Sequence, residues 1–275
     1  METRNVKEVK SAICNADRPP TKHKTAAELS SFVRVFDLWD TPSAEENFDP
    51  TTDSYAKETD DYILCLETVR KTFKSNYVLI VEDDVVMKLG SLKTLKYFIS
   101  NLETRHADDW IFLKLYYPKK WLGYSRELRT ILELISSSIL ISSIITIVIS
   151  LIKKIRSRSI IILQIFFSLI ILPTFLILGR QTSVRWREIS SSFHTLYLTP
   201  GCCTQAMLYN SKHISQLIEF LKKSRTNSKN PIDLLIDDYV KSADLRGYLV
   251  EPSLFDHIGF WSSFSNNKKD AIDFL

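Results

Sequence analysis

The amino-acid sequence predicts an α/β sandwich that is interrupted by a two-helix transmembrane hairpin. Segments with strand and helix patterns alternate along most of the 275 residues, which is typical of a sheet covered by helices. In the middle of the chain, two apolar runs without charged residues, 134–152 and 159–179, follow each other almost directly. Each run has roughly the 20 residues needed to cross a hydrocarbon core about 30 Å thick. A pair of buried core helices is the alternative, but both runs are apolar on every face and exceed the usual helix length of about 11 residues.

The hairpin divides the chain into three parts. Because two crossings return the chain to the side it left, residues 1–129 and 181–275 can form one domain in one compartment, with 130–180 as the hairpin. The connector 153–158 carries four basic residues, which favours a cytoplasmic loop. Basic residues also flank the outer ends of both runs, so the charge rule gives only a weak orientation. Pro173 is compatible with a membrane helix, since neighbouring groups can satisfy the freed carbonyl.

Ahead of the hairpin, the residue pattern predicts three strands and three helices. They are a strand over 9–14, a helix over 26–36, a helix over 55–73 after a loop over 40–53, a strand over 77–81, a helix from Ser91 to about Leu102, and a strand over 110–116. In the long second helix, Tyr62, Leu66, Val69 and Phe73 recur at helical spacing. The run 77–81 is fully apolar, which predicts a buried central strand. Ser91 is a suitable N-cap.

After the hairpin, the pattern continues with shorter elements. They are strands over 195–198 and 205–209 around the turn Pro200-Gly201, helices over 214–221 and 232–240, and a last strand over 247–250. Pro231 stands at a position that favours the start of the second helix.

Composition excludes some classes of function. The formal charge of +4 is small and dispersed, so it gives no support for a nucleic-acid partner. Cys14, Cys65, Cys202 and Cys203 have no spacing typical of a metal site. The adjacent pair is geometrically awkward for a disulfide, and no pairing is predicted. The first ten residues are charged, so they predict no signal peptide or anchor.

Three carboxylates follow the predicted central strand: Glu82, Asp83 and Asp84. Carboxylates that leave a buried strand together repel one another, and a divalent cation relieves that repulsion through hard oxygen ligands. Ligands of α/β sheets collect at the carboxyl ends of strands, where a metal can hold a diphosphate leaving group. The alternative is a solvated loop cluster, or one that caps the next helix.

The segment 78–86 resembles the acidic D-x-D motif of GT-A glycosyltransferases, here Glu82-Asp83-Asp84. The resemblance makes Asp84 the metal ligand and directs Glu82 and Asp83 towards the nucleotide ribose and supporting water. It implies a GT-A fold, a UDP-sugar donor, and Mn²⁺ or Mg²⁺ as the cofactor.

Three later segments, 200–209, 231–238 and 251–259, look like motifs of the Golgi transferase family that adds N-acetylgalactosamine to the glycan of GPI anchors. That family also splits its GT-A domain with a transmembrane hairpin, and the resemblance extends from about Ala12 to Ser263. It implies inverting transfer from UDP-GalNAc to a mannose of GPI-anchored proteins, by a multi-pass Golgi membrane protein with a lumenal catalytic domain. Family members also carry an N-terminal anchor and a first strand–helix unit, which we expect to be missing here.

An inverting sugar transfer needs a carboxylate that takes the proton of the acceptor hydroxyl. Asp233 and Asp237 are four residues apart, so they share a helix face, and Asp238 lies beside them. The family resemblance implies a base in this region, and we predict Asp237, with Asp238 as the next candidate. Acids that favour a helix N-terminus are the alternative, which suits Asp233 better than Asp237.

His257 and the segment around Gly201 are further candidates. Several GT-A enzymes use a late histidine to bind the metal or the diphosphate, although an ordinary hydrogen-bonded histidine is the alternative for His257. Gly201, Cys202 and Cys203 either shape the acceptor wall or form a simple tight turn.

Two other functions remain open. An N-glycan-branching N-acetylglucosaminyltransferase has similar late motifs, but a protein-borne acceptor gives no reason for a hairpin within the domain. A non-catalytic membrane protein that retained the fold would have little reason to keep the acidic triplet. A channel or transporter is disfavoured, because the apolar runs contain no ionisable residue.

Overall fold

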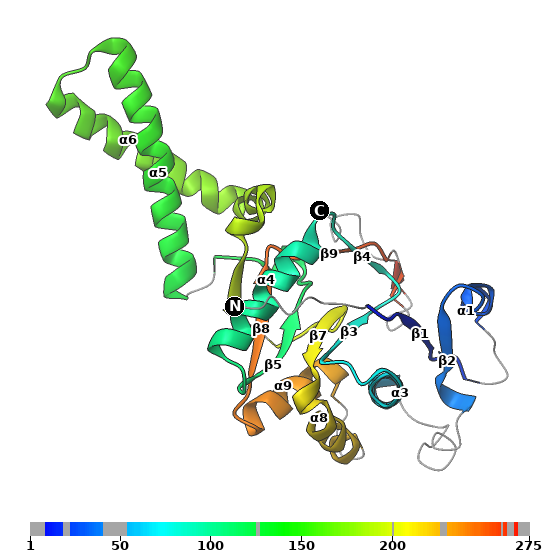
Figure 1. Ribbon diagram of the computed structural model, residues 1–275. Helices are drawn as coiled ribbons and strands as arrows, with labels where there is room; N and C mark the ends of the chain where they lie inside the picture. The colour runs from blue at the N-terminus through cyan, green and yellow to red at the C-terminus, as the bar shows by residue number, and fades with distance from the viewer. Residues whose placement is uncertain are drawn as a thin grey trace.

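The computed structural model describes residues 9–18, 23–40, 54–124, 127–199, 201–225, 230–259, 261–262 and 267–268. A mixed α/β body carries a pair of long helices that extends away from it (Figure 1). The α/β class predicted from the sequence is confirmed.

A five-stranded sheet lies at the centre of the body. Its order is β3 (Tyr77–Val81), β7 (Ala206–Asn210), β5 (Trp110–Lys114), β8 (Arg246–Glu251) and β6 (Thr195–Leu198). Only β5 and β8 pair in parallel. β3 and β5 come from before the long helices and β7, β8 and β6 from after them, and β7 lies between β3 and β5, so neither part of the chain forms the sheet alone.

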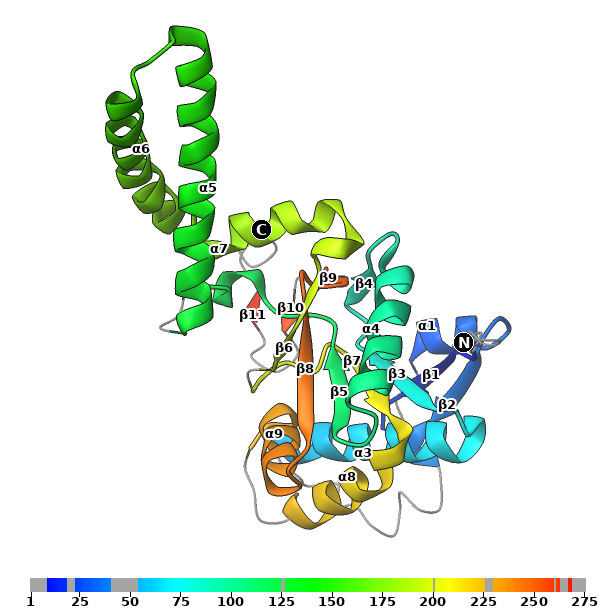
Figure 2. The ribbon, with the colours of Figure 1, turned by 60° about the vertical axis from the view of Figure 1, so that its left-hand side comes forward.

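Helices cover both faces of the sheet (Figure 2). One face packs against α3 (Ser54–Phe73), α8 (Ser211–Ser224) and α9 (Ile232–Ser242), and the other against α4 (Ser91–Arg105). The amphipathic pattern explains the packing, since α8 buries Ile214, Leu217, Ile218 and Leu221 at helical spacing.

The first described segment forms a strand–helix–strand unit. The strands β1 (Ala12–Asn15) and β2 (Arg34–Asp37) pair in parallel, and α1 (Lys24–Leu29) connects them. The predicted helix over 26–36 is therefore wrong in its second half. The helix ends at Leu29 with Ser30 as its C-cap, and Arg34–Asp37, which include β-branched Val35, pair with β1 instead. A disulfide between Cys14 and Cys65 joins this unit to α3.

Four further differences concern local structure and strand pairing. β3 is an edge strand of the described five-stranded sheet, not a central one.

The N-cap of α4 also differs from the prediction. Gly90, with φ of 82°, is the N-cap, whereas Ser91 is the first residue of the helix and donates a hydrogen bond to the Leu254 carbonyl. β6 and β7 are not neighbours in the sheet. The short strands β4 (Val85–Met87) and β9 (Phe255–His257), which the sequence did not predict, pair antiparallel. Of the predicted loop 40–53, residues 41–53 lie outside the described part.

The two long helices are α5 (Leu128–Lys153) and α6 (Ser157–Leu178). By length and composition both are apolar enough to cross a membrane, and within α6 no residue is buried. They pack through small polar side chains: Ser142 Oγ lies 2.8 Å from Ser168 Oγ and accepts a hydrogen bond from Gln164. Apolar helices that leave their apolar surface uncovered suggest a membrane protein.

Ion pairs join the foot of the α5–α6 pair to the sheet. Arg180 begins α7 (Arg180–Trp186) and pairs with Glu133 of α5 at 2.8 Å and with Glu251 of β8 at 2.6 Å. Arg187, in the following turn η3 (Arg187–Ile189), reaches Glu251 at 3.0 Å. Since Arg180 and Glu251 are both buried, this cluster fixes the two long helices to the end of β8.

Candidate active site

The acidic segment lies at the end of β3, where the chain turns into β4. The β4–β9 pairing places Val85 opposite His257, and the Ile258 amide donates to the Asp84 carbonyl at 2.7 Å. As a result His257 Nε2 lies 2.8 Å from Asp84 Oδ2. The Tyr116 ring stacks against the His257 imidazole, with ring centroids 5.8 Å apart. The structure therefore brings two of the predicted site residues into direct contact.

Gly259 leaves the space that the Asp84 carboxylate occupies. A Cβ at this position would overlap the Asp84 side chain at less than van der Waals distance. The absence of a side chain at Gly259 is thus required by the position of Asp84.

Glu82 contacts the loop before β7. Its Oε1 accepts a hydrogen bond from Thr204 Oγ1 at 3.0 Å, and its amide donates to the Gln205 carbonyl. Burial raises the pKa of Glu82 to about 7; the Thr204 hydrogen bond lowers it, and the charges of Asp84, Glu58 and Asp83 raise it further. Asp83 is exposed.

Asp84 and His257 together offer one carboxylate and one imidazole to a divalent cation. In the described part of the chain, no group of three or more His, Cys, Asp or Glu side chains could hold a metal ion. A carboxylate and an imidazole in contact offer two ligands. That set fits Mg²⁺ or Mn²⁺ only where substrate phosphates and water complete the coordination, as in nucleotide sites.

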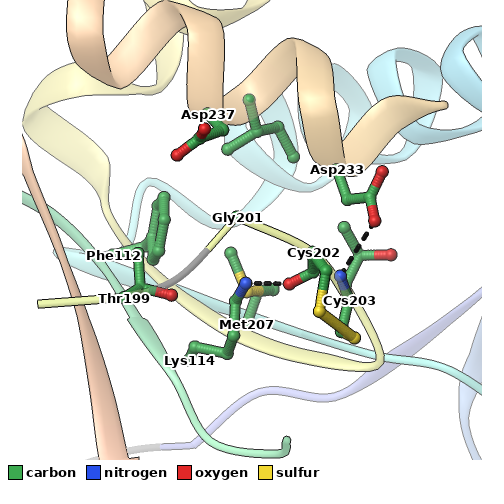
Figure 3. Close-up of a pocket in the computed structure, with 11 residues that line it drawn as sticks. Phe112, Lys114, Thr199, Gly201, Cys202, Cys203, Met207, Asp233 and Asp237 are labelled. Carbon is green, nitrogen blue, oxygen red and sulfur yellow. Dashed lines mark hydrogen bonds between the residues drawn. A yellow bond between two sulfur atoms is a disulfide. The ribbon is translucent and has the colours of Figure 1, made fainter. Parts of the chain in front are cut away.

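A small pocket with about 10 Å³ of internal space lies close to the acidic segment, and Figure 3 shows the residues that line it. Helix α9 forms one wall, strand β5 another, and the loop before β7 the floor. The lining residues are Phe112, Lys114, Thr199, Gly201, Cys202, Cys203, Thr204, Met207, Asp233, Ile236 and Asp237. Thr204 lines the pocket and also donates a hydrogen bond to Glu82, so this residue links the pocket to the acidic segment.

The predicted carboxylates of α9 fall into two groups. Asp233 and Asp237 line the pocket on the same helix face, as predicted, whereas Asp238 is exposed and does not line it. Asp233 accepts a hydrogen bond from the Cys203 amide at 3.0 Å. Asp237 pairs with Lys241 at 2.6 Å and lies close enough to Gly201 that a Cβ there would be 3.0 Å from its Oδ2.

Lys114 is a pocket residue that sequence reasoning missed. It is only 4% exposed, and its ammonium group donates a hydrogen bond to the Cys202 carbonyl. Burial lowers the pKa of Lys114 to about 8, against the opposing influence of Asp233 and Asp237. The sequence does contain a signal for it: Lys114 ends the otherwise apolar strand 110–114. A charged residue within a strand that is apolar on both faces is expected to be buried with a partner, which is typical of a functional lysine.

Cys202 and Cys203 form a disulfide with each other, contrary to the expectation that neighbours are awkward partners. Both have φ in the left-handed region, at 132° and 68°. This backbone conformation turns the loop so that the Cys202 carbonyl meets Lys114 and the Cys203 amide meets Asp233. The pair therefore lines the pocket; Pro200, the other half of the predicted turn, lies outside the described residues.

Comparison with known proteins identifies the family. No solved structure matches the chain. Residues 1–256 match the family described as GPI-N-acetylgalactosamine transferase PGAP4, a match that includes α5, α6 and both acidic segments. The family suspected from the sequence motifs is thereby confirmed, and the chain belongs to the PGAP4 family of GPI-N-acetylgalactosamine transferases.

Proposed function

We propose that this protein transfers N-acetylgalactosamine from UDP-GalNAc to a mannose of the GPI-anchor glycan, with inversion at the anomeric carbon and with the help of Mn²⁺ or Mg²⁺. The observation that carries the proposal is the Thr204–Glu82 hydrogen bond, which joins the acidic segment to the pocket containing Asp237. A donor diphosphate at one end and an acceptor hydroxyl at the other would thus lie next to each other.

The donor end consists of Asp84, His257 and the neighbouring Glu82 and Asp83. Asp84 and His257 would hold the metal ion, which neutralises negative charge on the departing diphosphate. The partly exposed turn leaves room for the nucleotide, and Glu82 and Asp83 would lie towards the ribose and its water. Gly259 keeps the Asp84 carboxylate in place for this role.

The acceptor end is the pocket between α9 and β5. Asp237 would act as the general base: the hydroxyl oxygen attacks the anomeric carbon, its proton passes to the Asp237 carboxylate, and the bond to the phosphate oxygen breaks with UDP keeping the electron pair. Asp237 is preferred to Asp238 because only Asp237 lines the pocket. Lys114 holds the Cys202 carbonyl and so fixes the floor on which the acceptor would rest.

The membrane location accounts for the choice of acceptor. We place α5 and α6 across the Golgi membrane and the α/β body in the lumen, since each helix is long and apolar enough to cross. A lipid-anchored glycan lies close to the bilayer, so a body fixed to the same bilayer would search for it in two dimensions.

The test is sugar transfer from UDP-GalNAc to a purified GPI glycan by the full chain in phosphatidylcholine vesicles. Asp84→Asn keeps the shape of the side chain but removes its charge, and we expect at least about a 10²-fold loss of kcat/KM. Asp108→Asn is the matched control, since Asp108 is an exposed surface carboxylate.

Alternative substrates distinguish the proposed activity from that of related glycosyltransferases. UDP-GlcNAc as the donor and an N-glycan as the acceptor should both be poor substrates. Efficient branching of the N-glycan would favour the other transferase class, and unchanged activity of Asp84→Asn would refute the donor site.

A further inference from the structure

We propose that a surface formed by α7, η3 and η4 (Ser191–Phe193) rests in the membrane–water interface and that its partner is the lipid bilayer itself. We call this surface the interfacial face. It consists of Trp186, Ile189 and Phe193, which are 72%, 79% and 55% exposed. The inference rests on the membrane-spanning part of the proposed function, and it does not depend on the transferase chemistry.

The position of α7 follows from the chain connection. Only Gly179 separates the end of α6 at Leu178 from the start of α7 at Arg180. Gly179 adopts φ of 76°, and at this turn α7 leaves the direction of α6 and runs sideways from the helix pair over the α/β body (Figure 2). If α6 crosses the bilayer, α7 begins where the chain leaves the hydrocarbon.

The Arg180–Glu133 ion pair at the base of α5 and α6 lies at the same height along these helices as the start of α7. Arg180, the first residue of α7, is bonded to Glu133 of α5 at 2.8 Å, so the first charged group after α6 and a charged group near the start of α5 meet at one height. Charged side chains are disfavoured within the hydrocarbon, which places this height at or just outside its boundary. The interfacial face starts at that boundary and lies alongside it.

The chemistry of the face matches the headgroup region. Tryptophan and other amphipathic or apolar side chains are favoured there, with cations at the polar side, and Arg185 is exposed next to Trp186. Three large apolar residues in one short exposed segment would be unfavourable in water. Continuity with the two long helices identifies lipid, and not a second protein, as what covers them.

The interfacial face is bonded to the strands that carry the candidate metal ligands. Glu188, between Trp186 and Ile189, pairs with Lys88 at 2.8 Å, and Lys88 follows β4 and also reaches Asp256 of β9 at 3.4 Å. Contact with the bilayer would therefore set the height and tilt of the Asp84–His257 pair above the membrane.

Site-specific lipid crosslinking tests the inference. The photoreactive residue p-benzoylphenylalanine replaces Trp186, Ile189 or Phe193, one at a time, in the full chain reconstituted into phosphatidylcholine vesicles. After illumination, mass spectrometry measures the fraction of protein carrying a phosphatidylcholine adduct. Ile162 in α6, 68% exposed, is the positive control. Phe32, 87% exposed and three residues after the end of α1, is the matched negative control, because α1 lies on the opposite side of the body from α5 and α6 (Figure 2).

We expect adducts at all three interfacial positions, at least about a third as abundant as at Ile162 and at least about 10-fold above Phe32. Adducts at Ile162 with only background at the three positions would overturn the inference while leaving the membrane-spanning helices intact. Crosslinks to a second protein copy would overturn it in favour of a dimer contact. Background at Ile162 as well would reject the spanning assignment together with the inference. Because the replaced side chains are exposed, packing is preserved, and protease resistance of the body checks this.

Discussion

His257 contacts Asp84 across the β4–β9 strand pair, with 2.8 Å between Nε2 and Oδ2, although the two long helices separate these residues in the sequence. The contact is maintained by backbone pairing on one side and by the Tyr116 ring on the other. It gives the end of β3 a second potential ligand, which the acidic triplet alone does not provide.

Gly259→Ala should reduce activity without unfolding the protein. The added methyl group would overlap the Asp84 carboxylate and displace it from His257, so we expect a loss of kcat/KM of about 10-fold or more, as for a misplaced site residue. Gly123→Ala is the matched control, because a Cβ there meets no atom within 4 Å. Equal activity of the two variants would mean that the position of Asp84 is unimportant.

Asp237→Asn should slow the chemical step. Loss of a general base typically costs about 10²–10⁴-fold in kcat, whereas binding of UDP, measured by calorimetry, should change little. Asp238→Asn, one residue further along α9 and exposed, should retain activity. A larger loss in Asp238→Asn than in Asp237→Asn would transfer the role to Asp238. If neither variant transfers the sugar more slowly than the wild type, both acids contribute only to the stability of α9.

Removal of one disulfide should lower stability, and removal of the other should lower activity. The Cys14–Cys65 bond closes a 51-residue separation, so its removal by paired Cys→Ser substitution should lower the free energy of unfolding by about 4 kcal/mol in the chain-entropy estimate. The Cys202–Cys203 bond closes almost no loop, so Cys202→Ser with Cys203→Ser should change stability little but lower transfer, because the bond shapes the pocket. Thermal unfolding and sugar transfer are measured on both variants, and the opposite pattern contradicts the assignment.

Glu58→Gln should alter the pH dependence of stability. Burial, and then the charge of Asp233, raise the pKa of Glu58 from its ordinary 4.5 to about 7. Between these values the folded state binds more protons than the unfolded state, so stability from this group is present below about pH 4.5 and is lost as the pH rises through 7. The Tm of the wild type, relative to Glu58→Gln, should fall across this window. A difference in Tm that is independent of pH would contradict the shift.

The sequence by itself determined the elements that depend on local pattern. Apolar spacing located α3, α8 and α9, two uncharged runs located α5 and α6, and the acidic triplet at the end of β3 marked the proposed donor end. These features need only neighbours within a few turns or one strand, because helix periodicity and uninterrupted hydrophobicity are properties of a short stretch of chain. The motif order also identified the family.

Tertiary structure alone decided which distant residues meet. The sequence named Asp84 and His257 separately, but only the β4–β9 pairing places them in contact. Lys114 becomes a pocket residue because β5 pairs between β7 and β8, so that its end faces the loop carrying Cys202. The edge position of β3 and the early end of α1 likewise follow from strand partners. Pairing between strands depends on contacts far apart in the chain, whose free energy no local pattern encodes.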